Sequence, residues 1–292
     1  MVASDIKKIV SRLLIFFVGI PLVVILILCC SFKQHLVVNL ILGALNVVAS
    51  LELRTILSKK IAVPGKISTA FFSAILPLAM VLHISFNLGT ELFSFIAVAS
   101  IGVFFLRGII GTAYTKQFIE KLGSSILLLV YPGMFSIWIM KIATLPYASS
   151  VMLVYVLSVF ANDSLAWLFG MLFGKNNRGI FPVSPNKSIA GFIGGLSTAI
   201  LVYVLASIFL PHFGITAFEA KFLPNILAAI LLGLATGLAT IAGDLVESAL
   251  KRSTEVKDSG TIMHGRGGML DSLDSLVFAA PVFWMLYRVL FV

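Results

Sequence analysis

Charged residues are scarce in this chain of 292 residues, where Asp, Glu, Lys and Arg together make up only 11%. A soluble domain carries about 25% charged residues, so this scarcity excludes water as the main solvent of the chain. Hydrophobic residues make up 60%, and they form runs of roughly 20 residues, the length that a helix needs to cross a bilayer. Backbone groups inside lipid must be satisfied within helices or closed barrels. Because the runs are continuous rather than alternating, we predict an all-α polytopic membrane protein.

Cysteines are also few, and no separate soluble module is visible. The two cysteines, Cys29 and Cys30, are adjacent inside an apolar run, where packing is a better interpretation than a disulfide or a metal pair. We find no internal repeat, low-complexity tract or linker. We therefore expect one membrane domain over residues 1–292, with scaffold or lipid-facing helices in 1–150 and the catalytic helices and cytoplasmic loops in 151–292.

The apolar runs predict about nine membrane-spanning helices. The first run is too long for a secretory signal peptide and lacks a small-residue cleavage site, so we interpret it as a retained helix. The expected spans are 13–32, 35–56, 68–86, 91–107, 123–145, 149–173, 190–210, 223–250 and 275–292.

The positions of Lys and Arg predict the orientation of these helices, because cytoplasmic loops carry an excess of both. If the N-terminus is cytoplasmic, 17 of the 21 Lys and Arg residues fall on the cytoplasmic side. The four on the outer side are Lys33, Lys141, Lys221 and Arg288. An odd number of spans then places the C-terminus outside. The net charge of +9 reflects this topology and attraction to lipid headgroups rather than nucleic-acid binding.

The residues that can carry chemistry gather near the C-terminus, in residues 244–274, which we call the polar segment. On a helix, Asp244 and Glu247 lie three positions apart and share a face. Asp271 and Asp274 share a face at the start of the last span, where negative charge suits the positive helix end. Converging carboxylates favour a hard divalent cation, and Mg²⁺ typically binds one or two carboxylates together with substrate phosphates.

Cations and glycines surround these carboxylates. The cations suit phosphate oxygens, and glycines let the backbone come close to a ligand. Together they are typical of phosphoryl or nucleotidyl transfer, where positioning and charge neutralisation supply the catalysis. The alternative is a helix-capping network in which the charges only pair with one another. The cations are Lys251, Arg252, Lys257 and Arg266, and the glycines are Gly265, Gly267 and Gly268.

Two acids lie in or at the end of predicted spans. An ionised carboxylate in a span costs a few kcal/mol, so Asp163 needs a partner on a neighbouring helix, a polar cavity or a cation. The loop that follows it contains Lys175 and Arg178, which either bind a ligand or only follow the topology. Glu52 and Arg54 either form a local pair or line an entry for lipid.

The polar segment and the loop before it resemble the signature of the bacterial phosphatidate cytidylyltransferases (CDP-diglyceride synthases). The resemblance covers residues 162–292, whereas the first half matches only in hydropathy. The matching stretches are Asn162-Asp163, Phe173-Gly174-Lys175, Ser184-Pro185-Asn186-Lys187-Ser188, Gly191-Phe192-Ile193-Gly194-Gly195, Gly243-Asp244-Leu245-Val246-Glu247-Ser248, Leu250-Lys251-Arg252, Lys257-Asp258-Ser259-Gly260 and Gly267-Gly268-Met269-Leu270-Asp271-x-x-Asp274. Arg266 stands where the family has a histidine and Ser272 where it has an arginine. Because arginine stays protonated, Arg266 suits phosphate binding but not proton transfer.

The resemblance implies transfer of CMP from CTP to phosphatidate, which yields CDP-diacylglycerol and pyrophosphate. It implies metal binding by Asp244 and Asp271, with Mg²⁺ and a monovalent cation such as K⁺, and the helical spacing adds Glu247. We expect catalytic roles for Asp244, Asp271, Asp274 and Lys257. The expected substrate-binding residues are Lys251, Arg252, Asp258, His264, Arg266, Ser184, Lys187 and Asp163. For His264, a phosphate contact is a better interpretation than general-base catalysis.

The expected partners are CTP, phosphatidate and membrane lipids, without nucleic acid, and a homodimer is left open. Both motif-bearing loops fall on the cytoplasmic side, so the active site is expected to face the cytoplasm from a bacterial inner membrane. Two alternatives remain. One is another CTP-dependent membrane lipid transferase or kinase, of the polyprenol type. The other is an ion-coupled transporter using Asp163 and Asp244, although transporters typically contain internal repeats.

Overall fold

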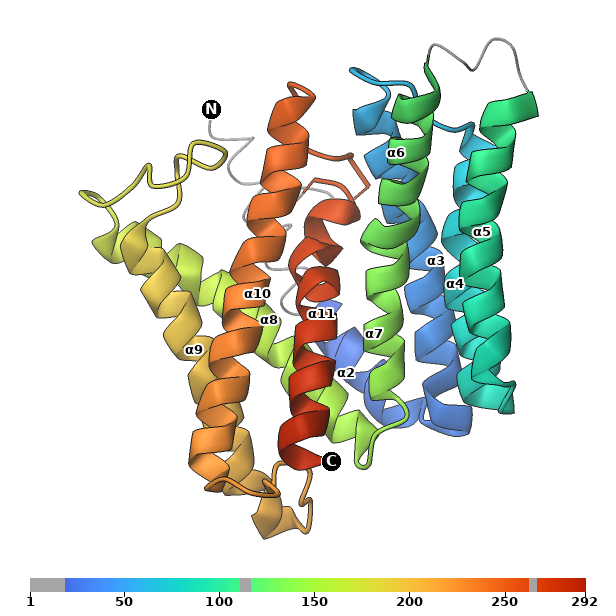
Figure 1. The fold of residues 1–292 in the computed structure, drawn as a ribbon. Coiled ribbons are helices and arrows are strands. Elements are labelled where there is room, and N and C mark those ends of the chain that lie inside the picture. The colour runs from blue at the N-terminus through green and yellow to red at the C-terminus, as the bar shows by residue number, and fades with distance from the viewer. Residues whose placement is uncertain (1–18, 111–116, 263–266) are drawn as a thin grey trace. The chain divides into compact units, whose positions relative to one another are not determined.

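The structure is a computed structural model that describes residues 19–110, 117–262 and 267–292. In that part of the chain every named element is a helix (Figure 1). One isolated bridge joins Arg178 and Ser188. The elements are α2 (Ile20–Cys29), α3 (Phe32–Leu57), α4 (Lys66–Phe86), α5 (Thr90–Ile110), α6 (Phe118–Leu128), η3 (Leu129–Met134), α7 (Phe135–Ile142), α8 (Ala148–Phe173), α9 (Ile189–Phe209), η4 (Leu210–Phe213), α10 (Asn225–Ser253) and α11 (Leu270–Phe291).

Within the described residues, eight helical stretches are long and apolar enough to cross a membrane, which confirms the prediction of an all-α polytopic membrane protein. The largest differences from the predicted bounds lie at the fifth and last spans, which begin at Phe118 rather than 123 and at Leu270 rather than 275. Hydropathy marks only the apolar part of a helix, and both helices start with a polar turn. The first predicted span, 13–32, lies partly outside the described residues. The predicted orientation stays a prediction.

Packing divides the chain into two compact units, and two of the boundaries between them fall near the end of α10 and near the start of α11. Unit 1 holds residues 1–140 and 250–273, and unit 2 holds residues 141–249 and 274–292. The single domain expected over residues 1–292 stays a prediction.

Unit 1 is built on the pairing of α3 with α4. The buried Asn46 side chain donates from Nδ2 to the Ser73 carbonyl oxygen at 2.9 Å, which satisfies a polar group inside an apolar interface. The turn after α3 is tied to α6, because Glu120 accepts from the Ala62 N–H at 2.8 Å and Ser124 Oγ donates to the Ala62 carbonyl at 3.0 Å. These contacts fix the end of α3, which carries Glu52.

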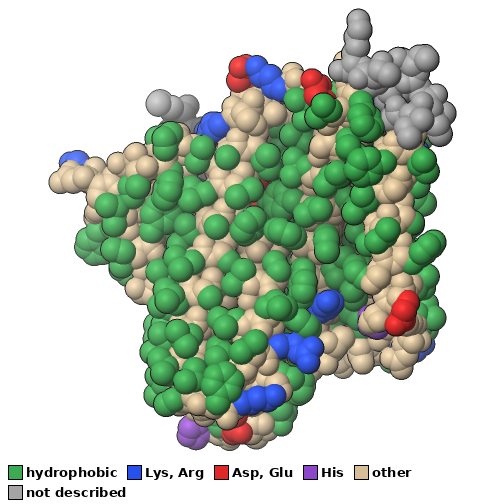
Figure 2. Space-filling view, in the orientation of Figure 1, with side chains coloured by type: hydrophobic (Ala, Val, Ile, Leu, Met, Phe, Trp, Pro, Cys, Tyr) green, Lys and Arg blue, Asp and Glu red, His purple; other side chains and the backbone are tan. Residues whose placement is uncertain are grey.

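Unit 2 packs α8, α9, α10 and α11 closely through small residues and an aromatic core. A Cβ added at Gly195 of α9 would lie 2.5 Å from Asn162 Oδ1 of α8, so only glycine permits this approach. The rings of Tyr155 and Tyr203 lie 4.6 and 5.9 Å from that of Phe283. On the face shown in Figure 2, hydrophobic side chains cover the lengths of α9 and α10, as expected for helices in lipid.

Candidate active site

The contact between α10 and α11 in unit 2 depends on Gly243. A Cβ at this position would lie 2.7 Å from the Phe278 Cβ and 3.1 Å from the Asp274 carbonyl oxygen. Real Cβ atoms do not approach a neighbouring Cβ this closely, so any larger residue would separate the two helices. The glycine therefore brings Asp244, the next residue of α10, close to Asp274 of α11.

Three carboxylates meet at this contact. One oxygen each from Asp244, Glu247 and Asp274 lies within 4.8 Å of the others; we call this group the acidic triad. Glu247 is 1% exposed and Asp274 6% exposed, whereas Asp244 is half-buried. The predicted sharing of a face by Asp244 and Glu247 agrees with this geometry. Mutual repulsion of buried carboxylates is relieved by a cation, so this group could hold a metal ion.

A lysine from another part of unit 2 contacts the triad. Lys187 Nζ forms an ion pair with Asp244 Oδ2, and both side chains are partly buried. The loop that carries Lys187 folds back on itself, since Gly179 N–H donates to the Lys187 carbonyl at 3.3 Å and Ile189 N–H donates to the Asn177 carbonyl at 3.0 Å. The loop is therefore held in place, and it delivers a positive charge to the carboxylates.

The start of α9 fixes the end of the same loop. Ser188 caps the helix, because its Oγ accepts the Gly191 N–H at 3.1 Å, a typical helix N-cap interaction. Ser184, predicted to bind substrate, is half-buried in the loop, and its carbonyl accepts the Lys187 N–H at 3.2 Å. Lys175 is exposed. Asp163 lies half-buried on α8, beside the fully buried Asn162.

In unit 1, Asp271 is the centre of a second group. Lys251 Nζ lies 2.5 Å from Asp271 Oδ1, and the two side chains are only 12% and 8% exposed. The other oxygen, Oδ2, accepts the N–H of Ser259 at 2.9 Å, the hydroxyl of Ser259 at 2.7 Å and the N–H of Gly268 at 2.6 Å. Asp271 therefore ties the loop of the polar segment to the start of α11. Its predicted role as a metal ligand stays a prediction.

Glu52 also belongs to this group, a role that its position in the sequence did not predict. Glu52 is 8% exposed, and its Oε2 accepts the Leu270 N–H at 2.8 Å and lies 3.4 Å from Ser259 Oγ. A Cβ at Gly268 would lie 2.4 Å from the same oxygen. Arg54, its suggested partner, donates instead to the Pro64 carbonyl at 2.7 Å. The only signal in the sequence was a carboxylate near the end of an apolar run.

The remaining predicted residues lie on the surface of unit 1 or outside the described residues. Arg252, Lys257 and Asp258 are exposed, and Arg252 donates to the Val256 carbonyl at 3.3 Å. His264 and Arg266 lie outside the described residues, so their predicted contacts with phosphate stay predictions.

These features define a class of protein. It is a polytopic membrane protein with a buried acidic triad, a lysine that contacts the triad, and a glycine-containing loop fixed by a buried ion pair. Oxygen ligands for a hard cation and lysines that bind phosphate are suited to chemistry on phosphate esters rather than to hydrolysis by a nucleophilic serine.

The chain belongs to the cytidylyltransferase family, whose model matches residues 10–290. A phosphatidate cytidylyltransferase of Aquifex aeolicus is 31% identical over 175 residues, which cover 60% of each chain. One of Haemophilus influenzae is 44% identical over 144 residues, covering 49% of this chain and 47% of the relative. An uncharacterised Escherichia coli protein, YnbB, is 35% identical over 154 residues, covering 52% of this chain and 47% of that protein. The matches thus span about half to three fifths of these relatives.

Proposed function

We propose that this chain transfers CMP from CTP to phosphatidate and so produces CDP-diacylglycerol and pyrophosphate. The observation that carries the proposal is the acidic triad of Asp244, Glu247 and Asp274 in a member of the cytidylyltransferase family. The relatives that are named phosphatidate cytidylyltransferases support phosphatidate as the acceptor. Because the matches to those relatives are partial, both substrates are part of the proposal.

We assign the triad to Mg²⁺. Carboxylate oxygens are ligands that this ion prefers, at about 2.0–2.1 Å, so two ligands on opposite sides of it lie roughly 4.2 Å apart. The oxygens of the triad lie within 4.8 Å of one another, and small side-chain rotations would bring them to that spacing. A divalent ion also suits a group of three carboxylates, of which Asp244 pairs with Lys187. Bound there, Mg²⁺ would neutralise phosphate charge on CTP. A nearby K⁺, and Asp271 as a further ligand, stay expectations.

We assign Lys187 of unit 2 to phosphate oxygens, and we keep Arg252 and Lys257 of unit 1 as candidates for the same role. Lys187 already contacts Asp244, so a phosphate that approaches the triad meets its ammonium group. Lys251 holds Asp271 and thereby orients the loop of the polar segment. The side chains of Arg252 and Lys257 are exposed, so they are free to reorient when a nucleotide phosphate binds. These residues bind and orient the substrates, which is the main task of a protein that catalyses transfer at phosphorus.

The transfer requires no strong base. The phosphate of phosphatidate is a monoester with a second pKa near 6, so it is largely ionised at pH 7. One of its oxygens attacks the α-phosphorus of CTP, the bond from that phosphorus to the bridging oxygen breaks, and pyrophosphate leaves with the electron pair. Catalysis then depends on alignment and charge neutralisation, which is consistent with a site built of carboxylates and lysines.

We place the active site at the cytoplasmic face of a bacterial inner membrane. The excess of Lys and Arg in the loops that carry Lys187 and the polar segment supports this orientation, and the named relatives are bacterial. Both CTP and the headgroup of an inner-leaflet phosphatidate would reach the site from that side.

The test supplies the purified chain with Mg²⁺, phosphatidate and CTP labelled at either the α- or the γ-phosphorus. We expect the α-label to enter the lipid and the γ-label to leave as pyrophosphate. Transfer of the γ-label to the lipid would instead identify a kinase, and no lipid product from phosphatidate, polyprenyl phosphate or other lipid phosphates would refute the proposal. Asp274→Asn serves as the inactive control.

A further inference from the structure

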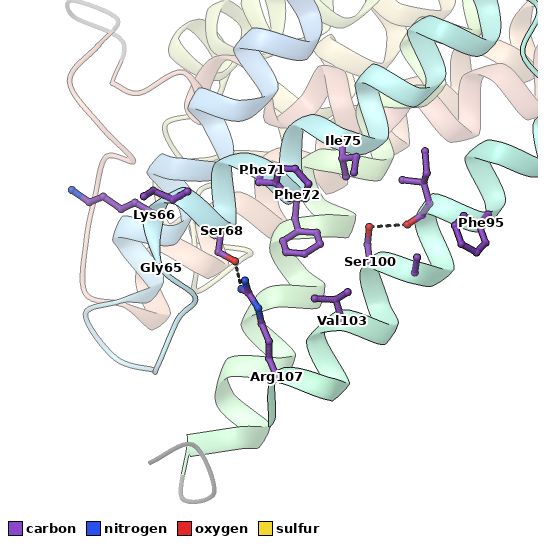
Figure 3. A pocket seen from close by; sticks show the side chains of 13 residues that line it. Gly65, Lys66, Ser68, Phe71, Phe72, Ile75, Phe95, Ser100, Val103 and Arg107 are labelled. Carbon is purple, nitrogen blue, oxygen red and sulfur yellow. Dashed lines mark hydrogen bonds between the residues drawn. The ribbon is translucent and has the colours of Figure 1, made fainter. Parts of the chain in front are cut away.

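An open groove lies between α4 and α5 in unit 1, and none of its residues belongs to the polar segment (Figure 3). Its volume is about 1480 Å³, which exceeds the roughly 300–1,000 Å³ of ordinary small-molecule pockets. A groove of this size, open along two membrane-spanning helices, suits a long apolar ligand. Its apolar walls are formed by Phe71, Phe72, Ile75, Phe95, Ile96 and Val103.

One end of the groove is polar and positively charged. Lys66 is the first residue of α4 and Arg107 lies in the last turn of α5, so both mark the same end of this antiparallel pair. The Arg107 guanidinium donates to Ser68 Oγ and lies 5.8 Å from the centre of the Phe72 ring, within the range of a cation–π contact. In Figure 3 Arg107 points toward Ser68, whereas Lys66 extends away from the groove.

Within the part of the chain that the structure describes, no acid balances the charge of Arg107. Among residues 19–110, 117–262 and 267–292, no carboxylate forms an ion pair with Arg107 or Lys66. A guanidinium has five N–H donors in a planar fork that matches phosphate, and Ser68 accepts only one of them. Arg107 also ends a candidate membrane span, so it lies at the depth of lipid headgroups, where an anionic lipid presents its phosphate.

We propose that this groove binds one anionic phospholipid of the surrounding bilayer, with its phosphate on Arg107 and an acyl chain along Phe71, Ile75 and Phe95. Charge and shape together specify the occupant. A free phosphate would leave the aromatic walls uncovered, and a lipid without net charge would leave Arg107 unbalanced. Phe95 is 69% exposed, so this face of α5 is open to a lipid. The bound lipid is retained rather than converted, so the inference does not rest on the proposed function.

The test measures which lipid stays with the purified full chain. The protein in mild detergent receives equal amounts of phosphatidylglycerol and phosphatidylcholine, without CTP, and native mass spectrometry counts the retained molecules. We expect one phosphatidylglycerol per chain in preference to phosphatidylcholine. Arg107→Gln should reduce that retention on the order of tenfold, as expected for loss of charge-assisted hydrogen bonds. Lys59→Gln, which removes one charge from an exposed turn outside the groove, should retain the lipid.

A second variant tests the apolar part of the site while keeping Arg107. Ala99 lines the groove, and Ala99→Phe should fill part of it and so reduce phosphatidylglycerol retention. Equal retention of the two lipids by the parent chain would overturn the inference. So would unchanged retention in both Arg107→Gln and Ala99→Phe. Because phosphatidylglycerol is not the proposed acceptor and CTP is absent, these outcomes are independent of whether CMP transfer occurs.

Discussion

The backbone N–H of Leu270 donates to Glu52 Oε2 at 2.8 Å, although the two residues are 218 positions apart. Leu270 is the first residue of α11, and the first N–H groups of a helix have no partner within the helix. Glu52 supplies the missing acceptor from α3, and its negative charge suits the positive end of the helix. Helix α3 thus fixes the first residue of α11, where the loop of the polar segment ends.

Glu52→Ala should destabilise the protein by about 1–3 kcal/mol, because it leaves the buried N–H of Leu270 without an acceptor. We expect a lower thermal unfolding temperature in detergent, together with slower CMP transfer. Glu52→Gln keeps an acceptor oxygen, so it should lower the unfolding temperature less than Glu52→Ala does. Glu219→Ala, at an exposed glutamate, is the control. An unfolding temperature for Glu52→Ala equal to that of this control would contradict the structural role.

Asp274→Asn removes one charge from the acidic triad and should weaken Mg²⁺ binding by at least about 100-fold, since even outer-shell changes at metal sites cost 10–100-fold. The Mg²⁺ dependence of CMP transfer gives one measurement. Binding of Mn²⁺, followed by electron paramagnetic resonance without substrates, gives a second that does not depend on activity. Unaltered Mn²⁺ binding in Asp274→Asn would show that Asp274 is not a metal ligand.

Gly243→Ala should separate α10 from α11 and disturb the triad, because its Cβ would lie 2.7 Å from that of Phe278. Overpacking of this kind typically costs about 1–3 kcal/mol, and CMP transfer should fall with it. Gly123 of α6 is a matched helical glycine, since a Cβ there meets nothing within 4 Å. Gly123→Ala should be neutral or stabilising by up to about 1 kcal/mol. Equal effects of the two changes would show that helix propensity, not helix contact, governs residue 243.

Lys251→Met should be among the most destabilising single changes in unit 1. Lys251 and Asp271 are nearly buried, and breaking a buried ion pair typically costs about 3–5 kcal/mol because the remaining charge is left uncompensated. Lys60→Met provides the comparison, since Lys60 pairs with Glu255 at the exposed surface. Unfolding by denaturant should separate the two variants clearly, and a similar loss in both would contradict the importance of burial.

The exposed ion pair of Lys60 and Glu255 also serves as a control in which stability is measured against pH. Its hydrogen bond and its charge attraction with Lys60 lower the pKa of Glu255. A lowered pKa means that any stabilisation by this pair is present at neutral pH and is lost as the pH falls through the folded-state pKa. Because the carboxyl is fully exposed, Lys60→Met should leave the acid side of the stability profile almost unchanged.

The orientation can be tested at the two ends of α9. Asn176 precedes this helix and Phe213 follows it, and both are exposed. With Cys29 and Cys30 replaced by serine, Asn176→Cys should react with an impermeant maleimide only from the cytoplasmic side, and Phe213→Cys only from the other side. Labelling of both positions from one side would refute the predicted topology.

Hydropathy was sufficient to predict the helices, because the need for about 20 apolar residues in a bilayer dominates the sequence of every span. Helical periodicity also predicted that Asp244 and Glu247 face the same way, since a spacing of three residues is a local property. The polar first turns of α6 and α11 were missed because the apolar run begins several residues after the helix does.

Contacts between distant helices could not be predicted in this way. The approach of Asp244 to Asp274 depends on the absence of a side chain at Gly243, and the pairing of Lys187 with Asp244 joins residues 57 positions apart. Neither contact produces a periodic pattern in the sequence from which it could be predicted. Glu52 is the clearest example, because nothing local distinguishes a carboxylate that accepts from Leu270 from one that pairs with Arg54.

The contact from Glu52 to Leu270 also limits how far the chain can be shortened. A fragment that begins after α3 would keep all the motif stretches within residues 162–292, yet it would lack the acceptor at the start of α11. Such a fragment would contain the reactive groups without the support that orders them. We therefore expect an active shortened version of this protein to need α3, although that helix carries none of the motif residues.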